Sequence, residues 1–120
     1  MPASVPPSLA QYTEASVAGD GLRWEGHMAD DIAATDGPIP MALLVATPEA
    51  LCLNSTRGNY RLPRSAVTRL GRGNFYPWFF SAVRIHHDVK GCPRELQFKP
   101  SRVKPAAVMA QLRSLGYPVG

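Results

Sequence analysis

The chain has 120 residues, of which 45% are hydrophobic and 18% charged. This composition supplies one compact core and excludes a chain that is disordered throughout. The net charge of +4 is unevenly spread, because residues 1–56 hold seven acids and one base while residues 57–120 hold two acids and twelve bases. Such asymmetry points to an acidic or anionic partner, or to two halves whose charges pair when the chain folds.

No apolar run approaches the roughly 20 residues that span a bilayer. The N-terminus shows no cationic start followed by an apolar block, so we expect neither a transmembrane segment nor a secretory signal, and a cytoplasmic protein. Residues 1–20 are predicted to be a partly flexible extension, since three early prolines oppose regular structure and residues 8–17 form at most a short helix. The folded domain is expected at residues 21–120.

The first strand is predicted at residues 21–28, where apolar and polar side chains alternate. One face holds Leu22, Trp24 and Met28, and the opposite face holds Arg23, Glu25 and His27. The acidic, turn-rich segment that follows, residues 29–38, is predicted to be a loop.

Four further strands are predicted at residues 40–47, 51–55, 60–62 and 66–72. Pro63 places the third of these at an edge or a corner of the sheet, because proline cannot donate to a ladder. In the fourth, Ala66, Thr68 and Leu70 are expected on one face. An aromatic loop at residues 71–78 comes next.

Strands are then expected at residues 79–89 and 95–99, on either side of a turn that contains Gly91. The last element is a helix with Ser101 as a possible cap and Pro105 in its first turn. Its apolar stripe consists of Val108, Met109, Leu112 and Leu115. Gly116 is expected to end this helix, because glycine is common just after the last helical residue.

The predicted fold is therefore mainly β with one C-terminal α-helix. Six to seven short strands form a curved antiparallel sheet or partly open barrel that the helix caps. Segments LLVATPEALCLNS, YRLPRSAVTRL and VRIHHDVKGCPRELQFKPS, with the final helix, resemble the pleckstrin-homology-like (PH-like) superfold in its compact bacterial and GRAM-type versions.

This resemblance implies a binding platform for phosphoinositide head groups, peptides or self-association. The lipid-binding version has basic residues in the loop after the first strand. Here that loop, residues 29–38, is acidic, which argues against phosphoinositide binding at this position.

Catalytic and metal-binding patterns are absent from the sequence, which contains no CxxC, HxxxH, GxSxG or phosphate-binding glycine motif. His86 and His87 are neighbours on a strand and point to opposite faces. Cys52 and Cys92 are interpreted as free thiols. The pair Asp30-Asp31 is more typical of a solvated turn than of a cation site or an acid–base pair. We expect a non-enzymatic protein without metal or cofactor.

The candidate binding segment combines arginines, which match phosphate and carboxylate, with aromatic residues. Its members are Arg57, Arg61, Arg64, Arg69, Arg72, Phe75, Tyr76 and Trp78. Protein contact or self-association into a homo-oligomer through the aromatic loop is the first interpretation. Binding to an anionic membrane surface through the arginines is the second, and nucleic-acid binding the third. The plainer alternative is that the arginines cover a solvent face and the aromatics fill the core.

Overall fold

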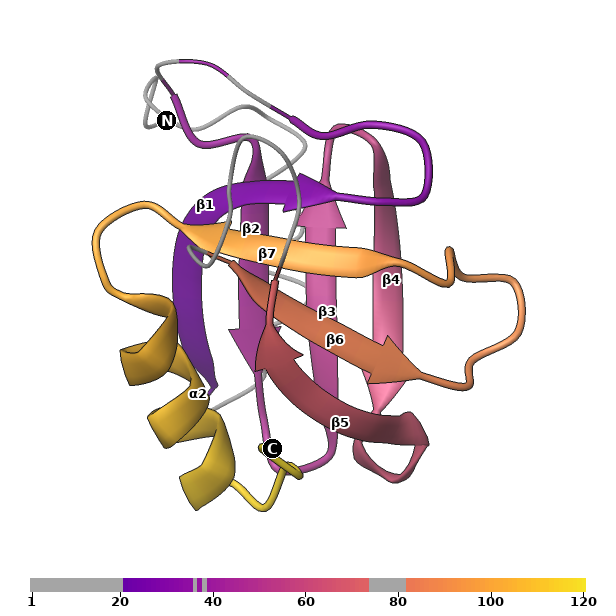
Figure 1. Cartoon of the computed structure of the whole chain (residues 1–120), viewed down its shortest axis with the longest axis vertical. Helices are drawn as coiled ribbons and strands as arrows, with labels where there is room; N and C mark the ends of the chain where they lie inside the picture. Colours follow the sequence, from indigo (N-terminus) through magenta and orange to yellow (C-terminus); the bar gives the residue numbers. More distant parts are fainter. Residues whose placement is uncertain (1–20, 36, 38, 74–81) are drawn as a thin grey trace.

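A computed structural model describes residues 21–35, 37, 39–73 and 82–120. Within them the chain forms one antiparallel sheet of seven strands, curled into a half-barrel, and one C-terminal helix (Figure 1). The predicted fold class is therefore confirmed. The strands are β1 (Leu22–Ala29), β2 (Ala42–Ala46), β3 (Ala50–Ser55), β4 (Gly58–Pro63), β5 (Val67–Arg72), β6 (Val83–His87) and β7 (Leu96–Pro100).

The strand order β4-β3-β2-β1-β7-β6-β5 is that of two meanders joined in the middle. The junction is strand β1, whose first part pairs with β2 and whose second part pairs with β7. Gly26 takes part in both pairings, opposite Ala42 and opposite Pro100. A Cβ atom at this position would collide with the carbonyl oxygen of Lys99, so the sheet bends here only because the residue has no side chain.

The core fills the concave side of the sheet and draws on every strand. Its largest fully buried side chains include Phe98, Met28, Leu44, Leu51, Leu53, Leu62, Leu70, Ile85, Leu96 and Leu112. Helix α2 (Pro105–Ser114) contributes the predicted stripe, with Val108 and Leu112 buried. The helix begins at Pro105 with Lys104 as N-cap, so Ser101 is not the cap, and Gly116 ends it with a φ of +99°.

The first strand departs from simple alternation in its second half. Leu22 and Trp24 are half-buried and Met28 is fully buried, as predicted, but His27 is buried as well. Its Nδ1 atom lies 3.0 Å from Oγ1 of Thr35, whose loop returns to β1. At His27 the face opposite Met28 is therefore not exposed, because the loop covers that end of the strand.

Strand β5 also differs from its predicted pattern. Val67 and Leu70 are buried while Thr68 and Arg69 are exposed, because the pairing with β6 shifts between Val67 and Arg69. Strand β6 is shorter than the predicted 79–89 among the residues described, and residues 74–81 lie outside them.

The C-terminal residues return to the sheet after the helix. Tyr117 is buried, and its hydroxyl donates to the carbonyl oxygen of Thr47 at 2.6 Å. Beyond it, Val119 forms a parallel bridge with Leu70 at the outer edge of β5. In the part of the chain that the structure describes, no helix is long and apolar enough to cross a membrane.

Candidate functional site

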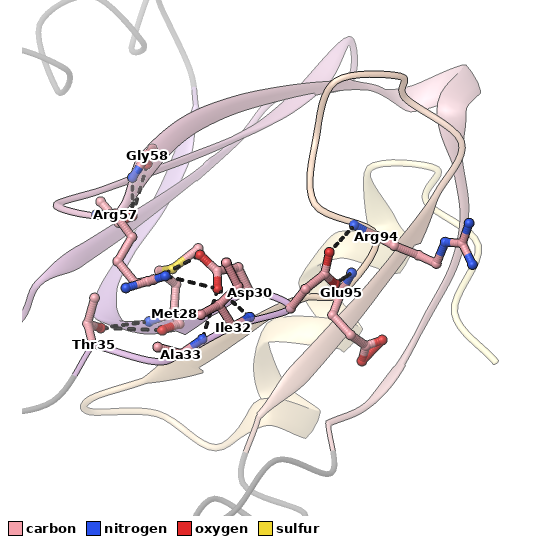
Figure 2. A network of polar contacts seen from close by, with 11 residues as sticks. Met28, Asp30, Ile32, Ala33, Thr35, Arg57, Gly58, Arg94 and Glu95 are labelled. Atoms are coloured by element: carbon pink, nitrogen blue, oxygen red, sulfur yellow. Dashed lines mark hydrogen bonds and ion pairs between the residues drawn. The ribbon is translucent and has the colours of Figure 1, made fainter.

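The first candidate arginine, Arg57, lies in the β3–β4 turn and is held by an aspartate of the loop after β1 (Figure 2). Its Nε atom donates to Oδ2 of Asp30 at 2.8 Å, and its Nη2 atom donates to Oδ1 at 3.2 Å. The same carboxylate accepts the backbone N–H groups of Ile32 and Ala33. Both partners are thus used within the fold.

Burial of the Asp30 carboxyl raises its pKa, whereas the hydrogen bonds from Arg57, Ala33 and Ile32 lower it. The hydrogen bonds prevail, so the pKa lies below its usual value of 3.8. Asp30 is therefore charged near neutral pH and its charge is matched by Arg57.

The neighbouring acid, Asp31, also accepts hydrogen bonds from backbone N–H groups, but from a different segment. Its Oδ1 accepts the N–H of Glu95 at 2.6 Å and its Oδ2 accepts the N–H of Arg94 at 3.2 Å, which ties the loop to the connection before β7. These contacts favour the interpretation of Asp30-Asp31 as turn residues. The described residues contain no cluster of His, Cys, Asp or Glu that is able to hold a metal ion.

The other candidate arginines are spread over the second half of the domain. Arg64 follows β4 in a short 3-10 turn. Its side chain donates to the carbonyl oxygen of Leu115, the C-cap residue of helix α2. Because Arg57 precedes β4 and Arg64 follows it, the two lie about 20 Å apart. Arg61 is exposed on β4, opposite Cys52 of β3. The structure does not bring these three arginines together.

Arg69 and Arg72 lie on β5 and are exposed. Arg69 donates through Nη2 to Nε2 of His86 on the neighbouring strand at 3.3 Å, so this imidazole nitrogen is unprotonated. The predicted aromatic members Phe75, Tyr76 and Trp78 lie outside the described residues.

The two histidines of β6, His86 and His87, both form hydrogen bonds through their rings. His87 donates from Nε2 to the carbonyl oxygen of Pro93 at 2.8 Å and accepts the N–H of Val89 at Nδ1. Both ring nitrogens thus hold the β6–β7 connection. His86, on the opposite face, lies next to Arg69 and Arg84. Sequence reasoning noted the opposite faces but missed these partners.

Charge pairing among the described residues is limited to Arg57–Asp30 and Arg84–Glu95. The first pair joins the acidic and the basic halves of the chain. Four candidate arginines have no carboxylate at ion-pair distance in the described part of the chain: Arg61, Arg64, Arg69 and Arg72. Within the described residues, the charges of these four arginines are therefore not matched by a carboxylate.

Cys52 and Cys92 form no disulfide, as predicted, and neither is fully buried. Burial raises the pKa of Cys92, which lies against the core, so this thiol is not activated as a nucleophile. Comparison of the chain with protein-family models, with curated proteins and with solved structures finds no match.

Proposed function

We propose that this chain is a non-enzymatic PH-like binding module that mediates protein contact or self-association. Support for the PH-like assignment comes from the order of elements. The hairpin at residues 47–51, the Leu62-Pro63 step at the end of β4, the β6–β7 strand pair and the closing helix all occur where the resemblance requires them. The resemblance implies six to seven strands followed by one closing helix, and seven strands followed by helix α2 agree with it.

The observation that carries the proposal of protein contact is the strand addition at the edge of the sheet. Strand β5 is the last strand of the sheet on its side. Leu70 N–H donates to the carbonyl oxygen of Pro118 at 2.7 Å, and Gly120 N–H donates to the carbonyl oxygen of Leu70 at 3.0 Å. The chain's own segment thus extends the sheet, and edge strands that accept an extended segment are a common means of protein recognition.

The same edge continues at Arg72. In an antiparallel strand the backbone groups of alternate residues face the same side, so Arg72 directs its N–H and C=O outward as Leu70 does. The residue is exposed and directly precedes the segment that leads into the aromatic residues. An added strand therefore meets a basic side chain at this position.

Two substitutions at one residue test this contact. Arg72→Pro removes the outward N–H and leaves the pairing with β6, whereas Arg72→Gln removes the charge and keeps the N–H. If self-association uses the edge, sedimentation velocity over a wide range of protein concentration shows oligomers for the wild type and Arg72→Gln, and monomers for Arg72→Pro. A wild-type monomer at every concentration contradicts self-association, and equal loss in both variants assigns the contact to charge.

A second candidate function is peripheral binding to an anionic membrane surface. The observation in its favour is the incomplete neutralisation of Arg61, Arg64, Arg69 and Arg72. Co-sedimentation with neutral and anionic liposomes at two salt concentrations tests it, with the double variant Arg61→Glu/Arg64→Glu as comparison. Binding that needs anionic lipid and is lost in salt and in the variant supports this function, since screened surface charge is its basis.

Two alternatives have less support. In the acidic loop after β1, Asp30 and Asp31 form hydrogen bonds within the fold, so nothing there favours a phosphoinositide site. Nucleic-acid binding rests on stacking by Phe75, Tyr76 and Trp78, which lie outside the described residues, and it stays a prediction.

A further inference from the structure

A cluster of three nitrogen-bearing side chains lies on the outer face of β5 and β6, away from the core. Val83 and Ile85 of β6 face the core. Because side chains alternate along a strand, Arg84 and His86 face outward. On β5, Leu70 faces the core, and Arg69 lies on the outer face opposite His86. The alternation of two paired strands thus brings Arg69, Arg84 and His86 together.

A buried glycine lies between them. Gly71, the cross-strand partner of Arg84, has no side chain on this face. A Cβ atom at that position would lie 3.5 Å from the backbone oxygen of Gly120 and 3.8 Å from Nε and Nη2 of Arg69, so Gly120 and the guanidinium group both pack beside the glycine. This arrangement agrees with the 3.3 Å separation of Arg69 Nη2 and His86 Nε2.

The charges around His86 are mostly positive. Burial, then Arg69 and Arg84, lowers the pKa of this imidazole, His87 lowers it further, and Glu95 raises it. The carboxylate of Glu95 also lies at the cluster, where its Oε1 atom forms an ion pair with Nη2 of Arg84 at 2.9 Å. One carboxylate therefore offsets one of two guanidinium groups, and the cluster keeps a positive charge that disfavours a proton on His86.

Two polar groups beside the cluster lack hydrogen-bond partners. They are Nε of Arg84 and the side-chain amide of Gln97, both within the described part of the chain. Gln97 is the cross-strand neighbour of Arg84 on β7 and its exposed fraction is 1%. Buried polar groups are nearly always paired. Of the three unpaired atoms, Nε of Arg84 and Nε2 of Gln97 are donors that an acceptor oxygen would satisfy, whereas Oε1 of Gln97 is itself an acceptor.

We propose that Arg69, Arg84 and His86 form a binding site for a phosphate group on the outer face of β5 and β6. This site goes beyond protein contact at the edge of the sheet and does not depend on it. A phosphate carries up to two negative charges and three acceptor oxygens, which matches two guanidinium groups and an imidazole that approach from two strands. Binding neutralises the positive charge and favours a proton on His86, which then donates as well.

The probes are inorganic phosphate and sulfate, added to the ¹⁵N-labelled full chain and followed by NMR of the Arg Nε and His ring signals. Chloride at equal ionic strength is the reference. Either oxyanion is expected to shift the signals of Arg69, Arg84 and His86 in a saturable manner, and chloride is not. Equal shifts with chloride, or shifts spread over all arginines, would overturn the proposal.

Matched variants separate the site from general surface charge. Arg69→Gln is expected to weaken phosphate binding about tenfold, because one charge-assisted contact is lost. Arg61→Gln makes the same change of charge on β4 and is expected to leave the affinity unchanged. Equal weakening by both variants would mean that only net charge matters and would contradict a defined site.

The pH dependence of sulfate binding tests the proton on His86. Sulfate keeps its charge across the titration range of histidine, so its affinity reports the state of the protein alone. Sulfate binding is expected to strengthen as pH falls from about 8 to 6, and this dependence is expected to disappear in His86→Gln. An unchanged pH dependence in that variant would remove His86 from the site. Phosphoserine and glycerol 3-phosphate, compared at one pH, then distinguish a protein-borne phosphate from a lipid headgroup.

Discussion

Arg57 and Asp30 form a two-point ion pair across the end of the half-barrel, with Nε to Oδ2 at 2.8 Å and Nη2 to Oδ1 at 3.2 Å. The Asp30 side chain is only 8% exposed, while that of Arg57 is 30% exposed. The pair fastens the loop after β1 to the β3–β4 turn, two segments that the strand ladders do not connect.

Asp30→Asn is expected to lower the free energy of unfolding by about 1–3 kcal/mol, because the hydrogen bonds to a charged, largely buried group are lost. Chemical denaturation at neutral pH measures the change. Arg57→Gln leaves the carboxylate in place and tests the other partner. Wild-type stability in both variants would show that the pair contributes nothing.

The same pair sets an acid dependence with a definite sign. Since the pKa of Asp30 in the folded protein lies below 3.8, the stabilisation is fully present above that value and is lost as pH falls through the lowered pKa. The difference in stability between wild type and Asp30→Asn is therefore expected to shrink toward zero in acid. A difference that stays constant with pH would contradict this origin.

Tyr117 is expected to matter through its hydroxyl. Tyr117→Phe removes the 2.6 Å bond to the carbonyl oxygen of Thr47 and is expected to cost about 1 kcal/mol of unfolding free energy. Tyr60→Phe, at a half-buried tyrosine, is the matched control and is expected to cost less.

Alkaline titration gives a second readout for Tyr117. Burial raises the pKa of this phenol from 10.0 to about 12. A raised pKa means that the stabilisation is complete below pH 10 and is lost as pH rises toward 12. Burial also raises the pKa of Tyr60. Ultraviolet difference spectra are therefore expected to show a late-titrating component that Tyr117→Phe removes and Tyr60→Phe does not.

Gly26→Ala is expected to destabilise the domain by about 3 kcal/mol or more, because the added methyl group collides with backbone rather than with a flexible side chain. Gly91→Ala is the control. That glycine has a φ of +86° and open space around it, so the expected cost is only about 1 kcal/mol of backbone strain. Equal costs in thermal unfolding would show that β1 shifts to admit the methyl group.

Gln97→Met is expected to leave the stability unchanged or to raise it by about 1 kcal/mol in phosphate-free buffer, because the amide is buried without a partner. The thioether has a similar length and needs no hydrogen bond. Gln111→Met, on the exposed face of α2, controls for the substitution itself. A clear loss of stability in Gln97→Met alone would mean that the amide is satisfied in solution.

Local sequence determined the elements of this fold. Alternation along β1, the apolar run of β2 and the stripe on α2 each follow from the period of the element, and Pro105 and Gly116 mark the ends of the helix. The edge position of β4 followed from Pro63. These features depend on neighbours in the chain, so a pattern of residue types is sufficient to predict them.

Tertiary structure alone decided which distant groups meet. The pairing of β1 with β7 joins the two meanders of the sheet, yet no local periodicity encodes a partner so far along the chain. The same holds for the contact of Arg57 with Asp30 and for the cluster of Arg69, Arg84 and His86, since strand register sets both. The sequence by itself showed a basic second half. The fold determined which of its arginines are neutralised, because charge pairing depends on separation in space and not on order in the chain.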